Sequence, residues 1–403
     1  MQFYNTIDEV RNYDLRSRKL MGYPISRCLC LLLPYLLNNN LAPEILNIGC
    51  ETGLLASVIA VRFPGIRMYG LDNNPHFIKV AEENNTFLQL LANHARIEYC
   101  ESGFSQLPVE DNAADIVIAY NTIYRCENPV GLLTECDRVC KPDGIIFFNE
   151  IIKDAEKQTL HFISSWLGDS REEFERTLKL AFTYKDLQNK LLEADLQNWS
   201  MYREKISVII SNKQLIPPSL LELRSLLSIE LDVFILLYQL AANLENKDSC
   251  LVDCSPLTNA ACIGLQYGAL QTNESALVIK INSDETKAAK SVFTYPLLKS
   301  KYKEASAIKI KSLTDSIDEI YEGKKIRMLY FNGSDDIKVF KEFFGKISHY
   351  FHQQIILIIH NFNFNLRGVD SDPQNHEKND FLKNRLGFQF ICSISHVGIF
   401  KKL

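Results

Sequence analysis

The chain has 403 residues, of which 46% are hydrophobic and 23% are charged, a composition typical of soluble globular proteins. Because a single hydrophobic core rarely grows past about 250–300 residues, this length predicts two domains. The net charge of −5 provides no basic field for nucleic acid or for an anionic membrane, so we expect neither as a partner.

The first residues, MQFYNTIDEVRNYD, are polar and do not resemble a signal peptide. The longest apolar stretches, near residues 28–37, 231–243 and 355–359, are shorter than the roughly 20 residues that a membrane span requires. The 11 cysteines are scattered and include no CxxC pair. Cys136 and Cys140 lie one helical turn apart, but without nearby histidines we favour buried thiols over a zinc site. We therefore expect a cytoplasmic protein.

From residue 45 onward, short apolar strands alternate with helical stretches, which predicts a parallel sheet covered by helices. A helical insertion is expected at residues 153–181, and the first domain is expected to span residues 1–212. The predicted strands, in chain order, are ILNIGC, IRMYGLD, IEYCES, ADIVIAYN, GIIFFNEI and one or two within WSMYREKISVIIS.

Residues 213–248 are predicted to form a helical connector, which begins near Pro217 and Pro218. A second alternating series follows over residues 249–403 and predicts a second α/β domain with the same organisation. Its predicted strands are SCLVDC, ALVIKI, AIKIKSL, IRMLYFN, QIILIIH and the segment FQFICSISHVGIFKK.

The first predicted strand leads through the turn Gly49-Cys50-Glu51-Thr52-Gly53 into a helix. Such a turn collects backbone N–H groups at a helix N-terminus, where they suit a carboxylate or a phosphate. The spacing is not GxGxxG, which disfavours a dinucleotide enzyme. Asp72 ends the next strand, 19 residues after Gly53, where a carboxylate can accept both hydroxyls of a ribose. A turn without a ligand, with Asp72 as a turn former, is the alternative interpretation.

The segment LPVEDNAADIVIAYNTIYRCENPVGLLTECDRVCKPDGIIFFNEI, residues 107–151, resembles class I S-adenosylmethionine-dependent methyltransferases of the type 11 family, which includes the ubiquinone and menaquinone enzymes. The turn likewise resembles the LDIGCGTG motif of that family, and the resemblance covers residues 40–211. The residues in register with the family pattern are Leu107, Pro108, Asp111, Asp115, Glu135, Arg138, Val139, Lys141, Pro142 and Gly144.

This resemblance implies a Rossmann-like, seven-stranded and mostly parallel sheet that binds S-adenosylmethionine. Asn47 replaces the usual acid of the motif, and Gly103 stands where the family has an adenine-facing Asp. Glu51 would lie beside the carboxylate of the cofactor, and it would replace the lost acid if it faced the ammonium or the sulfonium. The residues that the resemblance places at the cofactor are Asn47, Gly49, Cys50, Glu51, Gly53, Asp72, Asn73, Gly103, Phe104 and Asn121.

Methyl transfer requires mainly the alignment of a nucleophile with the methyl group and the exclusion of water, so no catalytic triad is expected. The catalytic candidates near the strand ends are Tyr124, Arg125 and Glu150, although a structural role is favoured for each. His161 and Trp166, on the insertion, would contact substrate or simply pack on the sheet. For Tyr4 and Tyr13, core packing is favoured over closure on the cofactor.

The second half resembles the type 24 methyltransferase-like group, but its ligand positions differ. Asp253 is the one motif acid that remains. Because amides cannot replace the charge of the missing acids, we predict a methyltransferase-like domain that binds no cofactor. His349 and His352 show no third metal ligand, so a surface helix is favoured and no metal is expected. The positions that depart from the group's pattern are Ser255, Asn259, Asn282, Asn332, Ser334, His360 and Asn361.

We therefore expect a methyltransferase that acts on a small molecule. The second domain would form a homodimer, stabilise the first domain or shape the substrate cleft. A non-catalytic scaffold is the main alternative, because Asn47, Glu51 and Gly103 depart from the cofactor motif. Methylation of protein or RNA is the third, and the acidic balance disfavours RNA.

Overall fold

The protein is represented by a computed structural model, which divides by its contacts into two units. The first unit comprises Met1–Ile25 and Tyr35–Pro217, and the second comprises Ser26–Pro34 and Pro218–Leu403. The expected boundaries, 1–212, 213–248 and 249–403, stay predictions. The residues that the structure describes are 4–20, 22–37, 43–63, 65–91, 96–216, 231–244, 249–255, 260–272, 277–282, 309–312, 321, 323–333, 336–362, 373–394 and 396–402.

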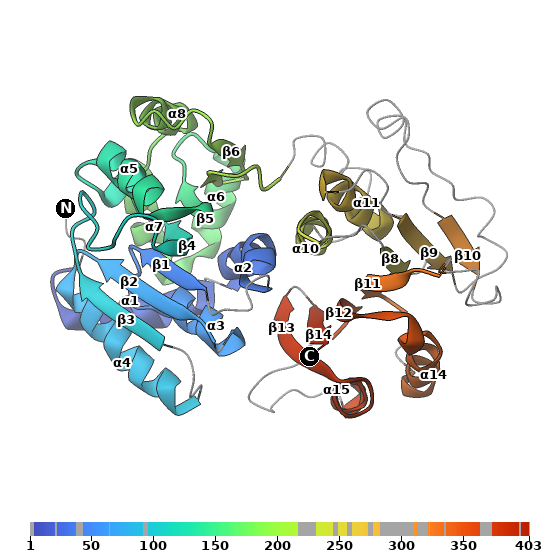
Figure 1. The fold of residues 1–403 in the computed structure, drawn as a ribbon. Helices are drawn as coiled ribbons and strands as arrows, with labels where there is room; N and C mark the ends of the chain where they lie inside the picture. The colour runs from blue at the N-terminus through green and yellow to red at the C-terminus, as the bar shows by residue number, and fades with distance from the viewer. Residues whose placement is uncertain are drawn as a thin grey trace. The chain divides into compact units, whose positions relative to one another are not determined.

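The first unit is built on a seven-stranded sheet with the order β3-β2-β1-β4-β5-β7-β6 (Figure 1). Neighbours among β1 to β5 pair in parallel, whereas β7 is antiparallel to both β5 and β6. This arrangement confirms the predicted mostly parallel sheet. The strands are β1 (Glu44–Ile48), β2 (Arg67–Asp72), β3 (Arg96–Glu101), β4 (Ala114–Tyr120), β5 (Cys140–Ile151), β6 (Ser200–Arg203) and β7 (Ser207–Ser211).

Helices cover both faces of this sheet, which is why its central strands are near-continuous apolar runs (Figure 1). Helix α4 contacts both α1 and α3, whereas α5 contacts α8. The helices of the unit are α1 (Ile7–Leu20), α3 (Leu54–Arg62), α4 (Pro75–Leu91), η1 (Ile123–Arg125), α5 (Pro129–Val139), α6 (Lys157–Trp166), η2 (Gly168–Ser170), α7 (Arg171–Leu180) and α8 (Tyr184–Glu193), while α2 (Gly22–Leu37) contributes to both units.

The register of the central strands brings three connecting loops together. Ile48, the last residue of β1, pairs with Leu71 of β2 on one side and with Ala119 of β4 on the other. Because parallel strands end at the same edge of a sheet, the segments after β1, β2 and β4 leave the sheet side by side. Asp72 and Asn121 are therefore neighbours of the glycine turn.

The second unit repeats this topology, with the strand order β10-β9-β8-β11-β12-β14-β13 and an antiparallel β14. The prediction that the second half repeats the organisation of the first is therefore confirmed. Its strands are β8 (Ser249–Cys254), β9 (Leu277–Asn282), β10 (Lys309–Ser312), β11 (Lys325–Phe331), β12 (Phe351–His360), β13 (Phe388–Ile394) and β14 (Val397–Lys402), and its described helices are α10 (Leu231–Ala242), α11 (Ala260–Thr272), α14 (Ile337–Ile347), η4 (Ser348–Tyr350) and α15 (Pro373–Leu386).

Two helical segments outside the predicted second domain belong to this unit. Helix α10, from the predicted connector, packs along α11, and Gly268 permits the approach because a Cβ there would lie 2.3 Å from the carbonyl oxygen of Tyr238. Residues 26–34 of α2 also group with the second unit. Arg27 in that stretch forms a buried ion pair with Asp232, with 2.6 Å between Nη2 and Oδ1. Among the described helices, none is long and apolar enough to cross a bilayer.

Candidate functional site

The turn after β1 has the backbone of a tight ligand loop. Gly49, Glu51 and Gly53 all have positive φ angles, of 65°, 51° and 73°. The N–H of Cys50 donates to the carbonyl of Leu71 at 2.9 Å, which fixes the turn to the end of β2. A Cβ at Gly49 would lie 2.4 Å from the hydroxyl oxygen of Thr122, so only glycine allows the loop after β4 to approach this closely.

The carboxylate of Asp72 joins this turn to the start of α4. Its Oδ1 accepts a hydrogen bond from the N–H of Asn74 at 3.0 Å, and its Oδ2 accepts one from the N–H of Glu51 at 3.1 Å. The side chain is only 1% exposed. Asp72 therefore organises the loops around it, in addition to any role toward a ligand.

Arg125, in the turn η1 after β4, bridges the two acids of the site. Its Nη1 donates to Oε1 of Glu51 at 2.9 Å, and its Nη2 donates to Oδ2 of Asp72 at 3.3 Å. Burial lowers the pKa of Arg125, but Asp72 and Glu51 outweigh this effect and raise it. The guanidinium is therefore permanently charged, and two carboxylates share it. Nη2 also lies 3.1 Å from where a Cβ on Gly49 would stand, so the guanidinium covers the turn.

Glu51 is held from the opposite side by the hydroxyl of Tyr13 in α1, which donates to Oε2. Burial raises the pKa of Glu51, while Arg125 and Tyr13 act in the opposite direction. The Tyr13 ring also packs on Tyr4 and Phe77, with centroid separations of 5.1 and 5.4 Å. Tyr13 thus packs in a small core, as favoured from the sequence, and also contacts the turn, while its closure on the cofactor stays a prediction.

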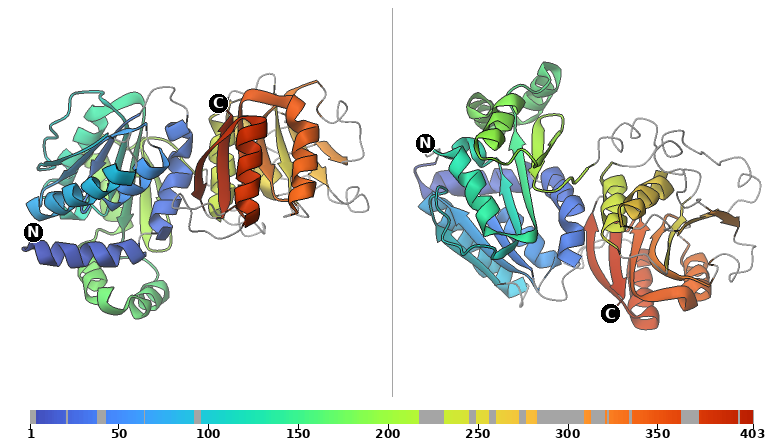
Figure 2. Two further views of the ribbon diagram at one scale, coloured as in Figure 1. Left: turned by 90° about the horizontal axis from the view of Figure 1, so that it is seen from below. Right: turned by 45° about the horizontal axis from the view of Figure 1, so that its top comes forward.

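Helix α7 of the insertion lies beside α1 and forms hydrogen bonds with α1 and with the residue Tyr4 before it (Figure 2). The Tyr4 hydroxyl donates to Oε1 of Glu173 at 2.5 Å, and Nη2 of Arg16 donates to Oε2 at 3.1 Å. A hydrogen bond also joins Thr177 of α7 to Tyr124, and burial raises the pKa of that phenol to about 12. Helices α1 and α7 therefore meet beside the turn and η1.

Glu150, at the end of β5, supports the loop that carries Arg125. It is 2% exposed, and Oε1 accepts the N–H of Thr122 at 2.7 Å. Burial raises its pKa to about 8, against the effect of the surrounding N–H groups. Asn121, with a φ of 50°, accepts the N–H of Ile151 at 2.9 Å through its side chain. Glu150 and Asn121 therefore hold the loop to β5.

The remaining predicted residues occupy different environments. Asn73 and Gly103 are exposed, whereas the Phe104 side chain is buried in the hydrophobic core of the unit. His161 is exposed on α6, and so is Trp166, whose side chain is 78% accessible. A small pocket at the turn is lined by Ser17, Asn47, Gly49, Cys50, Glu51, Thr52, Leu54, Leu55 and Tyr120. Thr122, Asn74 and Glu173 were not predicted, and no motif in the sequence marked them.

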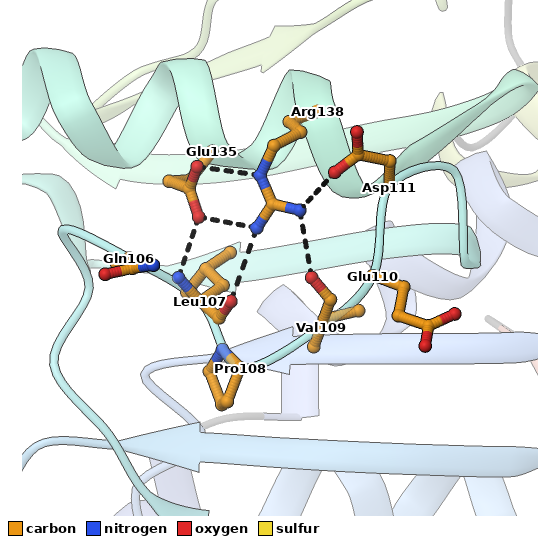
Figure 3. A pocket seen from close by; sticks show the side chains of 8 residues that line it. All are labelled: Gln106, Leu107, Pro108, Val109, Glu110, Asp111, Glu135 and Arg138. Carbon is orange, nitrogen blue, oxygen red and sulfur yellow. Dashed lines mark hydrogen bonds and ion pairs between the residues drawn. The ribbon is translucent and has the colours of Figure 1, made fainter.

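Within residues 107–151, which resemble the type 11 family, several groups accept hydrogen bonds from the Arg138 side chain (Figure 3). The guanidinium donates twice to Glu135, at 2.8 and 2.7 Å, and once to Asp111 at 2.6 Å. It also donates to the carbonyl groups of Leu107 and Val109. These contacts therefore hold the loop between β3 and β4 to α5.

The equivalent edge of the second unit is arranged differently. Asp253 is fully buried, and its Oδ1 accepts the N–H of Ser255 at 2.9 Å. Nδ1 of His360 lies 3.2 Å from the Tyr330 hydroxyl. Within the described ranges, no group of three or more potential metal ligands occurs. The predicted departures at Asn259 and Ser334, and the side chain of Asn282, lie outside the described residues.

Comparisons with known proteins agree with the first unit. Residues 46–148 match the type 11 family model described as "Methyltransferase domain". A ubiquinone biosynthesis O-methyltransferase of Leptothrix cholodnii is 25% identical over 123 residues, which are 30% of this chain and 50% of that protein. A human thiol S-methyltransferase is 27% identical over 157 residues, 36% of this chain and 58% of the relative.

A solved structure, a methyltransferase from Aquifex aeolicus, shares 17% identity and a TM-score of 0.35, and the match covers 52% of this chain and 98% of that one. The chain spans about half the length of the curated relatives that it matches first. The family match points to S-adenosylmethionine as the cofactor. The match of residues 46–148 to this family model thus supports a class I S-adenosylmethionine-dependent methyltransferase in the N-terminal half.

Proposed function

We propose that the first unit binds S-adenosylmethionine at the turn Gly49–Gly53 and transfers its methyl group to a small-molecule acceptor. The observation that carries this proposal is the buried carboxylate of Asp72 beside a turn that needs its glycines. The names of several relatives, which refer to ubiquinone biosynthesis, a sterol and a thiol, support a small acceptor.

The residues of the site fit this cofactor by their chemistry. The turn leads into α3, whose first N–H groups receive no side-chain cap from Gly53 and would suit a carboxylate, and Asp72 would supply the acceptor for ribose hydroxyls. Asn47, Cys50 and Gly53 would shape the same end of the cleft, and Asn121 would line its centre. Asn73, Gly103 and Phe104 are proposed to flank the adenine from the neighbouring loops.

When bound, the cofactor supplies a sulfonium whose methyl group is already activated, so the protein chiefly has to align the acceptor and exclude water. Helices α1 and α7, joined through Glu173, would exclude water. Tyr124 keeps its proton at neutral pH, because its pKa is about 12, and would act as a hydrogen-bond donor rather than as a base. We assign Glu150 to positioning the loop, and His161 to the surface of the helical insertion.

For the second unit we propose a non-catalytic role, which would be dimerisation, stabilisation of the first unit or shaping of the substrate cleft. Asn282 and Asn332 support this, because they stand where the resembled group has acids and an amide cannot replace the missing negative charge. A non-catalytic scaffold is the second candidate for the whole chain. The pairing of Arg125 with Asp72 favours it, since that pairing occupies the acceptor of the cofactor site.

Calorimetric titration of S-adenosylmethionine and of its demethylated product, S-adenosylhomocysteine, into the full chain separates these candidates. We expect one site per chain and loss of binding in Asp72→Ala. Asp111→Ala is the matched control, because this acid pairs with Arg138 instead and is 70% exposed. Binding that survives in Asp72→Ala would remove the assignment of Asp72, and two sites per chain would contradict the role given to the second unit. If neither the folded wild-type protein nor a folded Arg125→Gln variant binds either compound, the non-catalytic scaffold is the candidate that remains.

A further inference from the structure

The acceptor that a ribose would need is already engaged within the protein. Oδ2 of Asp72 receives both the N–H of Glu51 and Nη2 of Arg125, and Oδ1 receives the N–H of Asn74. The carboxylate is 1% exposed, and the guanidinium over it is 11% exposed. While Arg125 remains in place, a ligand hydroxyl cannot bond to Oδ2, because both lone pairs of that oxygen already accept donors, and the 1% exposure of the side chain leaves little access to Oδ1.

We propose that Arg125 competes with the cofactor for the carboxylate of Asp72. When the cofactor displaces the Arg125 guanidinium from Asp72, Glu51 retains that guanidinium. This inference rests on the proposed function and identifies Arg125 and Glu51 as positioning residues for cofactor binding. Glu51 then needs no direct contact with the cofactor. Its effect on affinity passes through Arg125.

The geometry of the guanidinium makes such a transfer possible. Arg125 uses separate nitrogens for its two partners, Nη1 for Glu51 and Nη2 for Asp72. The bond to Glu51 is the shorter, at 2.9 Å against 3.3 Å. A small rotation of the side chain can therefore release Asp72 while the stronger pair persists, and no buried charge is left without a partner.

The unusual backbone of Glu51 gives a second reason to assign it a role. A left-handed conformation costs a non-glycine residue roughly 1–2 kcal/mol, and glycine would adopt it freely. The residue is nevertheless held rigidly, by Arg125 on one oxygen and Tyr13 on the other. Strain that is fixed by two specific contacts typically accompanies function. Retention of the Arg125 cation accounts for the carboxylate at this position.

The inference predicts opposite effects for the two partners. If Arg125 covers Asp72 in about nine-tenths of the molecules, its removal tightens cofactor binding about tenfold. Arg125→Gln should therefore bind S-adenosylmethionine more tightly than the wild-type protein. Glu51→Gln should bind more weakly, because Arg125 then has only Asp72 as a charged partner. Glutamine has the same backbone strain as glutamate, so this change isolates the charge.

The test is a double-mutant cycle on the full chain, measured by calorimetric titration with S-adenosylmethionine and S-adenosylhomocysteine. We expect Glu51→Gln to lose affinity alone but to have little effect when added to Arg125→Gln. A direct contact between Glu51 and the cofactor would instead give the same loss in both backgrounds, and would overturn the inference. Arg138→Gln is the control, since it breaks a comparable ion-pair network and should leave affinity unchanged.

Arg125→Lys provides a second variant if the glutamine variant does not fold, since one ammonium keeps the charge but cannot span both carboxylates with a planar fork. We expect it to tighten binding to a smaller extent. If the wild-type protein binds but neither Arg125 variant binds more tightly, the inference fails and the proposed function stands. If only the Arg125 variants bind, the inference is supported. If no folded variant binds, both proposals fail.

Discussion

The buried carboxyl of Glu150 gives a sharp prediction for the pH dependence of stability. Burial raises its pKa from 4.5 to about 8, so the folded protein binds a proton here that the unfolded chain has already lost at neutral pH. Stability from this group is therefore complete below pH 4.5 and falls as the pH rises toward 8. At about 1.4 kcal/mol per pKa unit, the loss approaches roughly 5 kcal/mol, an upper bound. Glu150→Gln resembles the protonated acid and avoids this loss.

We expect Glu150→Gln to be as stable as the wild-type protein near pH 4.5. Between pH 5 and 8, its stability should progressively exceed that of the wild-type protein. Each kcal/mol corresponds to roughly 2–4 °C in the melting temperature of a unit of this size. Scanning calorimetry at four pH values measures the difference. Glu135→Gln is a control of opposite sign, because its hydrogen bond with Arg138 lowers the pKa of Glu135, so that variant should be destabilised at neutral pH. A difference for Glu150→Gln that does not change with pH would refute the reasoning.

Two further substitutions test the turn and the second unit. Gly49→Ala should lower the melting temperature and weaken cofactor binding, because alanine at φ 65° costs about 1–2 kcal/mol and its Cβ would meet Thr122. The control is Gly345→Ala, at an open helical position, which should be neutral or stabilising. Equal effects of the two changes would contradict this account. Arg27→Met should destabilise the second unit by about 3–5 kcal/mol in denaturant unfolding, because it removes the cation facing buried Asp232. Adding Asp232→Leu should restore most of this loss, whereas additive losses would show that the ion pair is not the cause.

The sheet of each unit could be predicted from the sequence because burial on both faces produces continuous apolar runs. ADIVIAY in β4 and QIILIIH in β12 are such runs, and both units have the predicted parallel core. The ends of β5 were harder to predict, since the strand begins at Cys140, before Lys141 and Pro142. The predicted strand began at Gly144, whereas the observed strand also includes the exposed or half-buried residues before it.

The position of the candidate site was also predictable, but its internal pairing was not. Gly49 and Asp72 each follow a strand, and parallel strands place such residues at one edge. The sequence left open whether Glu51 faces a cation of the cofactor, and in the structure it faces the cation of Arg125, which lies 74 residues later in the chain. Such contacts depend on loop paths and side-chain rotamers, which periodicity does not encode. The contact between Tyr4 and Glu173 was unpredictable for the same reason.

The assignment of residues 26–34 to the second unit affects how this protein can be divided. A fragment that ends at Pro217 would retain the stretch CLCLLL, residues 28–33, whose side chains are at most 2% exposed in the intact chain. Removal of the second unit would expose that stretch and favour aggregation. A fragment that begins at Pro218 would lack Arg27, and the carboxylate of Asp232 would lose its cation. A single cut therefore damages both products, so the two halves have to be expressed and assayed as one polypeptide.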